Sequence, residues 1–194
     1  MQLIVVCIAL IVTIFNSCGK NCANTTYSFE LPVKAFPDRD TVKVGDTLWL
    51  EINESVEFTN TDGKRINYSG AENLGSAIGF SLWDNVLKKW NNAADSFSYS
   101  LISGVTVNNT KLIREYTFSE QNGRYIFKLG VIPKAKGLNS LLFSNSNNTF
   151  RKNDKCTKAN FTINFRNTNQ HYYLSPFYTG QPNLVGGDYY FMVK

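Results

Sequence analysis

The chain has 194 residues, of which 43% are hydrophobic and 14% aromatic, a composition typical of a globular protein and not of a disordered one. Its length is enough for one well-packed domain. The net charge of +5 is modest and its lysines and arginines are dispersed. Because nucleic-acid binders usually concentrate such residues on one surface, we expect no nucleic-acid partner.

An uncharged apolar run, Leu3 to Phe15, lies at the start of the chain. A membrane-spanning helix needs about 20 apolar residues, so this shorter run has the length of a signal-peptide core. It ends in Phe15-Asn16-Ser17-Cys18. This ending resembles the lipobox of bacterial lipoproteins, in which a hydrophobic residue and two small residues precede a cysteine. Residues 1–17 are therefore interpreted as a lipoprotein signal peptide.

The lipobox resemblance implies that the sulfur of Cys18 carries a diacylglycerol and that cleavage makes Cys18 the N-terminus. Several acyl chains hold a protein stably on a membrane, whereas one holds it only marginally. Gly19 follows where an Asp is one inner-membrane retention signal in this family, so the resemblance implies delivery to the outer membrane of the bacterial envelope. Residues 18–26 would be a lipidated tether and residues 27–194 a single domain. The alternative is an ordinary secretory signal, which would leave Cys18 as a plain thiol.

Two of the four cysteines remain for a disulfide. Cys7 leaves with the signal peptide, and Cys18 takes the lipid. Paired thiols persist in the oxidising space outside the cytoplasm, so we predict a bond between Cys22 and Cys156. The bond requires the strands that follow these two cysteines to be neighbours. The alternative is two unrelated thiols.

The segment Thr41 to Ile52 alternates in the manner of a half-buried strand pair or a bulged strand. Gly45-Asp46 forms its irregular point. It resembles an early strand of bacterial immunoglobulin-like domains, which often show a hydrophobic pair, Gly-Asp and then alternating hydrophobic residues. The residues expected on the buried face are Val42, Val44, Leu48, Leu50 and Ile52.

The segment Ser81 to Asn91 has a different period. Leu82, Val86 and Trp90 recur at helical spacing, which predicts a short helix. We expect this helix to pack over one end of the sheet, with a partner-binding helix as the alternative.

The second half of the chain again favours strands. Lys111–Phe118 and Arg124–Ile132 flank a segment that contains Asn-Gly, and this dipeptide supplies the positive φ angles of a tight hairpin. Asn160–Arg166 alternates without a fault, and Asp188–Val193 is expected to be a closing strand. The predicted fold is therefore mainly β: an antiparallel β-sandwich, immunoglobulin-like or jelly-roll-like, with one short helix.

Aromatic residues crowd a segment near the C-terminus. It contains His171, Tyr172, Tyr173, Phe177 and Tyr178. Exposed rings of this kind form ligand-binding surfaces, for example those that stack sugars. Buried rings fill the space between two sheets. Both interpretations remain open from the sequence.

Catalytic motifs are scarce. The sequence has one histidine, His171, and it lacks zinc-binding spacings, a nucleophile elbow and a phosphate-binding glycine loop. A Cys156–His171 nucleophile pair is arithmetically possible, but an exported cysteine is more often in a disulfide. We therefore expect no metal, no cofactor and no catalytic residue of a known motif. An unidentified carboxylate pair stays possible, with candidates Glu51, Glu54, Glu57, Asp84 and Glu115.

Two classes of function follow from these observations. The first is a membrane-anchored envelope lipoprotein with a noncatalytic binding, adhesion or assembly role. Its partners would be the membrane, through the lipid on Cys18, and a glycan or another envelope protein. The second is a carbohydrate-active hydrolase that uses an unidentified Asp/Glu pair. A pocket with two carboxyls of raised pKa would favour the hydrolase.

Overall fold

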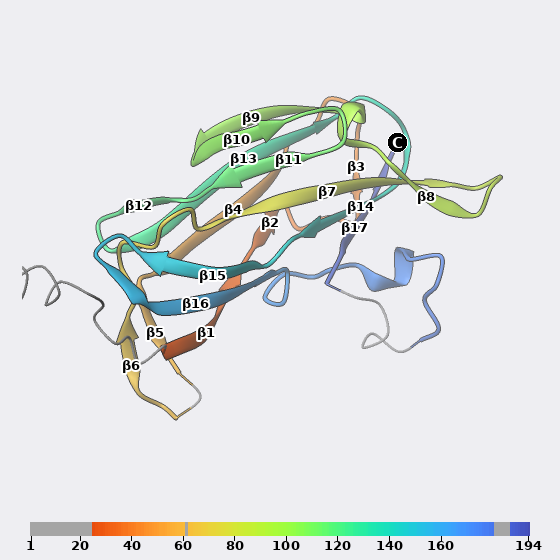
Figure 1. Ribbon diagram of the computed structural model, residues 1–194. Coiled ribbons are helices and arrows are strands. Elements are labelled where there is room, and N and C mark those ends of the chain that lie inside the picture. Colours follow the sequence, from red (N-terminus) through yellow and green to blue (C-terminus); the bar gives the residue numbers. More distant parts are fainter. Residues whose placement is uncertain (1–24, 61, 181–186) are drawn as a thin grey trace, which may run out of the picture.

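A computed structural model describes residues 25–60, 62–180 and 187–194 of the chain. Within these ranges strands predominate, and helix is limited to two short 3-10 turns, η1 (Ala94–Ser96) and η2 (Tyr172–Leu174). In the described residues, no helix has the length and apolar character needed to span a membrane. The predicted signal peptide, Cys18 and Cys22 lie outside the described residues. The fold is mainly β and is a β-sandwich, which confirms the predicted fold class (Figure 1).

The larger sheet of the sandwich has seven strands. In spatial order they are β10 (Val105–Asn109), β11 (Arg114–Thr117), β7 (Gly75–Asp84), β14 (Gly137–Phe143), β17 (Tyr189–Val193) and β3 (Thr41–Val42), and β8 (Lys89–Asn92) pairs with part of β7. All of these pairs are antiparallel except β17 with β3.

The opposing sheet has five strands, all paired antiparallel. Their order is β12 (Ser119–Gln121), β13 (Arg124–Pro133), β4 (Leu48–Ser55) and β2 (Lys34–Phe36). β12 pairs with the first residues of β13, and β9 (Phe97–Ser103) pairs with residues 128–133 of the same strand.

Two smaller sheets extend the sandwich at one end (Figure 1). The first has the order β1 (Thr25–Pro32), β16 (Asp154–Asn164) and β15 (Ser146–Arg151), and the second pairs β5 (Glu57–Thr59) with β6 (Arg65–Asn67). β1 and β16 run parallel, with Thr25 opposite Thr157. The predicted strand Asn160–Arg166 coincides with the last part of β16, which ends at Asn164, and the predicted closing strand Asp188–Val193 is β17.

The core lies between the two larger sheets because their strands alternate buried and exposed residues. Fully buried side chains include Leu48, Leu50 and Ile52 of β4, Phe127, Leu129 and Val131 of β13, Leu141 of β14, and Tyr189 and Phe191 of β17. Aromatic rings from the two sheets contact each other: the ring centroids of Phe97 and Phe80 are 5.3 Å apart, and those of Phe127 and Phe143 are 6.2 Å apart. The buried hydrophobic residues of the described chain run from Phe29 to Val193, so this one domain contains its own core.

The segment Thr41–Ile52 is two strands in different sheets. β3 belongs to the seven-stranded sheet and β4 to the five-stranded sheet, so Gly45-Asp46 marks the passage between them. Gly45 has a φ of +88°, and the Asp46 carboxylate accepts the N–H of Lys43 at 2.9 Å. Val44 is 44% exposed at this turn. Its predicted place on the buried face is therefore wrong.

The helix predicted over Ser81–Asn91 is also wrong. The segment is the β7–β8 hairpin, with a four-residue turn at Asn85–Lys88. A helix would have needed to bury Leu82, Val86 and Trp90 as one stripe, yet Val86 is 88% exposed. β7 instead pairs with β11 and β14, and its alternating residues Ile78 and Phe80 are buried in the core. Long-range pairing therefore decided the conformation.

The hairpin predicted around Asn122-Gly123 is present, with φ angles of +50° and +68° at these two residues. Its first strand is only β12, Ser119–Gln121. The preceding strand, β11, pairs with β7 and β10 of the other sheet. The chain therefore changes sheets at Phe118, and the predicted first strand Lys111–Phe118 was wrong in its pairing.

Candidate binding surface

The β7–β8 hairpin protrudes from the end of the sandwich that lies away from the start of β1 (Figure 1). Its turn is held by Asp84, whose Oδ1 accepts the backbone N–H groups of Val86 and Leu87, each at 2.9 Å. The Leu87 N–H is the main cause that lowers the pKa of Asp84. This arrangement leaves the side chains of Val86 and Leu87 88% and 61% exposed.

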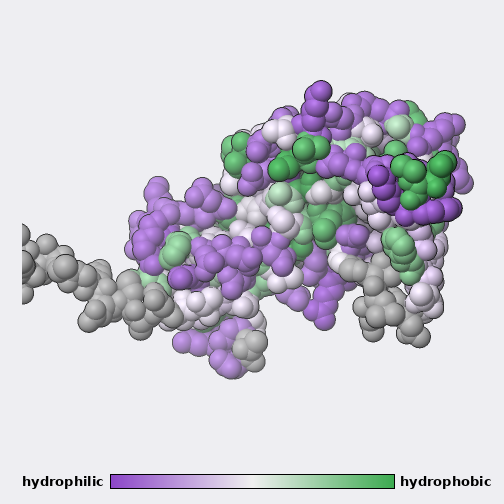
Figure 2. Space-filling view, turned by 45° about the vertical axis from the view of Figure 1, so that its right-hand side comes forward, coloured by the Kyte–Doolittle hydropathy of each residue, from purple (hydrophilic) through white to green (hydrophobic). Residues whose placement is uncertain are grey.

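Two tryptophans lie at the base of this turn. Trp83 and Trp90 are cross-strand partners, with their ring centroids 5.3 Å apart in an edge-to-face arrangement. Phe177 contacts Trp83 edge-on at 5.5 Å, and Tyr190 lies 6.0 Å from Trp90. The hairpin is thus joined by ring contacts to residues far along the sequence. Figure 2 shows hydrophobic residues at its tip with hydrophilic residues around them.

A groove of about 440 Å³ runs beside the hairpin. Its lining includes Trp83, Lys88, Leu138, Leu174, Pro176 and Met192. Asn85 and Gly137 complete the lining, so the groove presents polar as well as apolar groups, and its volume falls in the range of ligand sites.

His171 and Tyr172 are structural parts of this end of the molecule. His171 is 3% exposed, its Nδ1 lies 3.1 Å from the carbonyl oxygen of Tyr190, and its Nε2 lies 3.3 Å from Asp38 Oδ1. Both ring nitrogens therefore have polar neighbours. The Tyr172 hydroxyl donates to the side-chain oxygen of Gln170. The imidazole of His171 is thus not exposed, as the predicted ligand-binding role would require.

The rest of the aromatic segment is exposed. Tyr173, Phe177 and Tyr178 are 55%, 62% and 39% exposed. The Tyr173 hydroxyl donates to Asp40 Oδ2 at 2.7 Å, and this bond is the main cause that raises the pKa of Tyr173 and lowers that of Asp40. The cluster predicted from the sequence thus divides into a buried half and a surface half.

A partly buried acid, Asp188, lies next to Tyr189 at the start of β17. Burial raises the pKa of Asp188, whose Oδ2 accepts the hydroxyl of Tyr190 at 3.1 Å. Burial, followed by the charge of Asp188, raises the pKa of Tyr190. Of the shifted carboxyl pKa values in the described chain, only that of Asp188 is raised, whereas those of Asp40, Asp84 and Asp154 are lowered.

The five carboxylates considered for catalysis are distributed over four strands: Glu51 and Glu54 on β4, Glu57 on β5, Asp84 on β7 and Glu115 on β11. Glu51 lies on β4 with its Oε2 3.5 Å from Lys128 Nζ, and Asp84 is used in the β7–β8 turn. Glu115 lines a different pocket, beside Ser76 and Ser144. In the described ranges, no three His, Cys, Asp or Glu side chains are grouped to hold a metal.

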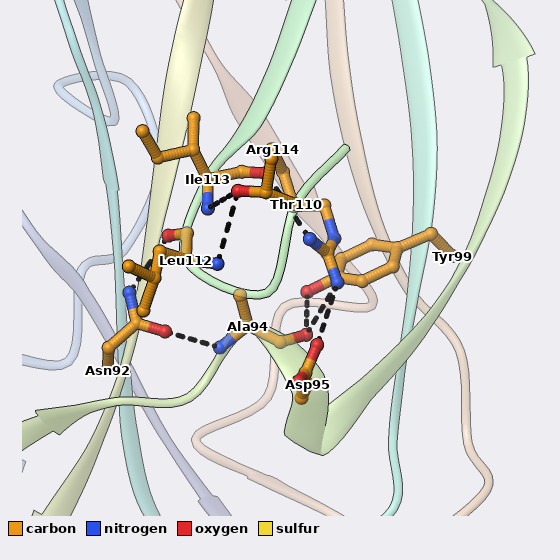
Figure 3. Close-up of polar contacts among 8 residues, drawn as sticks. All are labelled: Asn92, Ala94, Asp95, Tyr99, Thr110, Leu112, Ile113 and Arg114. Carbon is orange, nitrogen blue, oxygen red and sulfur yellow. Dashed lines mark hydrogen bonds and ion pairs between the residues drawn. The ribbon is translucent and has the colours of Figure 1, made fainter. Parts of the chain in front are cut away.

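A second set of exposed apolar side chains lies on β9, on β10 and in the loop that follows β10. Ile102, Val105, Val107, Leu112 and Ile113 are each between 43% and 64% exposed. The loop before β11 is fixed by Thr110, whose Oγ1 accepts the N–H groups of Leu112 and Ile113 at 3.3 and 3.1 Å (Figure 3).

A buried arginine ties this loop to η1. Arg114 is 6% exposed, its guanidinium lies 3.3 Å from Asp95 Oδ1, and its Cζ sits 4.8 Å from the centre of the Tyr99 ring (Figure 3). The Tyr99 hydroxyl donates to the carbonyl oxygen of Ala94 at 2.6 Å. The group is structural, since it joins β9, β11 and η1 at the edge of the sandwich. No sequence motif marks Asp95, Tyr99 and Arg114 as such a group.

No protein-family model matches the chain, and a comparison with curated proteins finds no match. The fold and surface define a β-sandwich with a protruding aromatic hairpin and a groove beside it. Sequence reasoning missed this hairpin. The signal for it was the pair of tryptophans on either side of Asp84-Asn85, residues that favour a turn.

Proposed function

We propose that the protein is a lipoprotein of the bacterial cell envelope, held on the outer membrane by lipid on Cys18, and that its β-sandwich is a noncatalytic binding, adhesion or assembly module. The anchor rests on the apolar run Leu3–Phe15 and the lipobox-like residues that end at Cys18. The observation that carries the binding role is the exposed surface of the β7–β8 hairpin and Phe177.

The positions of the two features in the fold support this combination. β1 begins at one end of the sandwich, and the β7–β8 hairpin protrudes from the other (Figure 1). A domain tethered through the residues before β1 would therefore present the hairpin away from its own membrane. Exposed aromatic and aliphatic side chains on such an end can contact a partner without interference from the anchor.

A disulfide between Cys22 and Cys156 is part of the proposal. Cys22 precedes β1 in the sequence and Cys156 lies within β16, and these two strands are parallel neighbours, as the bond requires. Thr25 lies opposite Thr157, so Cys156 is at the end of the pair where the chain enters β1. Such a bond would fasten the tether to the domain.

The hydrolase alternative has less support. A carboxylate pair that works as acid and base or nucleophile usually has separated pKa values in one pocket. Asp188 has a raised pKa, but its bonded neighbour is the Tyr190 hydroxyl and not a second carboxylate. The noncatalytic role is therefore the better proposal.

The anchor is tested by fractionation of cells that produce the full chain and its Cys18→Ser variant. The parent protein should be in the membrane fraction in a processed form, because the thioether-linked lipid holds it there. The variant should accumulate as unprocessed precursor or as soluble protein. A variant that is processed and membrane-bound like the parent would refute the lipoprotein assignment.

A further inference from the structure

We infer that the tip of the β7–β8 hairpin, Val86 to Lys89, docks onto an anionic phospholipid bilayer. The inference rests on the proposed function, because it names the partner of that surface. In a protein anchored through Cys18, the bilayer reached by the tip is a second membrane.

The apolar character of the tip is the first argument. Val86 and Leu87 occupy the most protruding turn of the hairpin and are 88% and 61% exposed (Figures 1 and 2). Aliphatic side chains on a convex tip offer no hydrogen bonds to the hydroxyls of a sugar. They can, however, enter the hydrocarbon of a bilayer, where each fully buried Val or Leu is worth roughly a factor of ten or more in affinity.

The charge around the tip is the second argument. Lys88 and Lys89 follow the aliphatic pair and are both exposed. The nearby carboxylate of Asp84 is turned toward the backbone, where it accepts the N–H groups of Val86 and Leu87. Lysine stems lie along apolar surface while their ammonium groups reach the headgroups. Each lysine near an anionic bilayer is worth about fivefold in affinity.

The tryptophans supply the third argument. Trp83 and Trp90 lie at the base of the turn, each partly buried, and Phe177 is exposed beside Trp83. Indole rings prefer the boundary between hydrocarbon and headgroups because one edge is polar and the rest is apolar. The hairpin thus carries aliphatic side chains at its tip for the hydrocarbon and tryptophans at its base for the boundary, and the long stems of Lys88 and Lys89 let their ammonium groups extend to the headgroups.

The test uses the full-length protein, produced with its lipid and reconstituted in phosphatidylcholine donor vesicles. Labelled acceptor vesicles of phosphatidylcholine with phosphatidylglycerol are added, and captured label is measured after flotation. We expect capture of anionic acceptors by the parent protein. Val86→Asp with Leu87→Asp should lower capture at least a hundredfold, and Lys88→Glu with Lys89→Glu about thirtyfold or more.

The matched control is Ile102→Asp with Val105→Asp, which places the same charges on exposed aliphatic positions at the end of β9 and the start of β10. Its capture should equal that of the parent. The melting temperatures of the tip variants should also be unchanged, since the replaced side chains are exposed.

Flotation of the protein with its own donor vesicles reports the anchor separately, so failure of the proposed anchor is distinguished from failure of the tip. If the protein floats with its donor vesicles but captures no anionic acceptor vesicles, this result overturns the inference. Equal capture by the parent and the Val86→Asp, Leu87→Asp variant does so as well. A third outcome is that the parent protein binds immobilised polysaccharide and captures no vesicles. If the Val86→Asp, Leu87→Asp variant then loses the polysaccharide binding, the tip is assigned to a carbohydrate partner instead.

Discussion

At the scale of single residues, the aromatic segment near the C-terminus contains side chains of two kinds. Tyr172 is partly buried and bonded to Gln170, whereas Phe177 is 62% exposed. Tyr172→Ala should therefore lower the free energy of unfolding by about 2 kcal/mol, and Phe177→Ala by less than about 1 kcal/mol. Thermal or urea unfolding of both variants checks this. Equal losses would show that Phe177 is part of the core.

Asp188 gives a pH-dependent prediction. Burial raises its folded-state pKa, so the protonated form is favoured in the folded protein. Its contribution to stability is fully present below the unfolded-state pKa and is lost as the pH rises through the folded-state pKa. Asp188→Asn should therefore leave the protein as stable as the parent or more stable at pH 7, because the amide oxygen can still accept the Tyr190 hydroxyl. A clear loss of stability of Asp188→Asn at pH 7 would contradict the raised pKa of Asp188.

Gly104 joins β9 to β10 and shows where a glycine is required. Its φ is +110°, and a Cβ there would lie 2.9 Å from the carbonyl oxygen of Thr117 and 3.0 Å from Phe127 Cδ2. Gly104→Ala should cost about 3 kcal/mol, from the disfavoured backbone and the close contacts together. Gly63→Ala is the control, since Gly63 has a φ of +76° with nothing within 4 Å of the added carbon. Its cost should be only about 1 kcal/mol.

At the scale of elements, strands with strong alternation could be predicted from the sequence. Asn160–Arg166 and Asp188–Val193 were recognised because alternate residues, such as Phe161 and Ile163, face the core. The Asn122-Gly123 turn was recognised because its φ angles need those residues. Local rules sufficed in these segments because local and long-range preferences agree.

Sheet assignment could not be predicted, because it depends on pairing across the chain. The helical spacing of Leu82, Val86 and Trp90 was misleading, since pairing of β7 with β14 sets the conformation of this segment. The candidate surface was missed for the same reason. Trp83 and Phe177 are far apart in the sequence, and their contact exists only in the folded sandwich.

The β1–β16 pair gives the prediction at this scale. Alkylation of the mature protein without reductant should add no group at Cys22 or Cys156, because the proposed disulfide would leave neither thiol free. Reduction should lower the free energy of unfolding by about 4 kcal/mol, since the bond closes a long loop of the chain. Cys156→Ala should match the reduced parent. Two added alkyl groups in the unreduced protein would show that the bond is absent.

At the scale of the whole molecule, β1 begins at one end of the β-sandwich and the aromatic β7–β8 hairpin protrudes from the other (Figure 1). The β7–β8 hairpin extends the sheet beyond its core, and Asp84 holds the turn that exposes Val86 and Leu87. The buried residues of the segment 170–175 support the same end, since Gln170 donates to the carbonyl oxygen of Asp188 at 2.9 Å. The sandwich thus separates this surface from the start of β1, where the proposed tether would join the domain.

The mass of the N-terminal peptide of membrane-extracted protein tests the anchor most directly. We expect this peptide to begin at Cys18 and to carry a thioether-linked diacylglycerol, because the proposed function takes the apolar run before it as a signal peptide and not as a membrane span. Treatment with a thiol reagent should leave Cys18 unmodified in this peptide. A peptide that begins elsewhere, or that begins at Cys18 with a free thiol, would contradict the account.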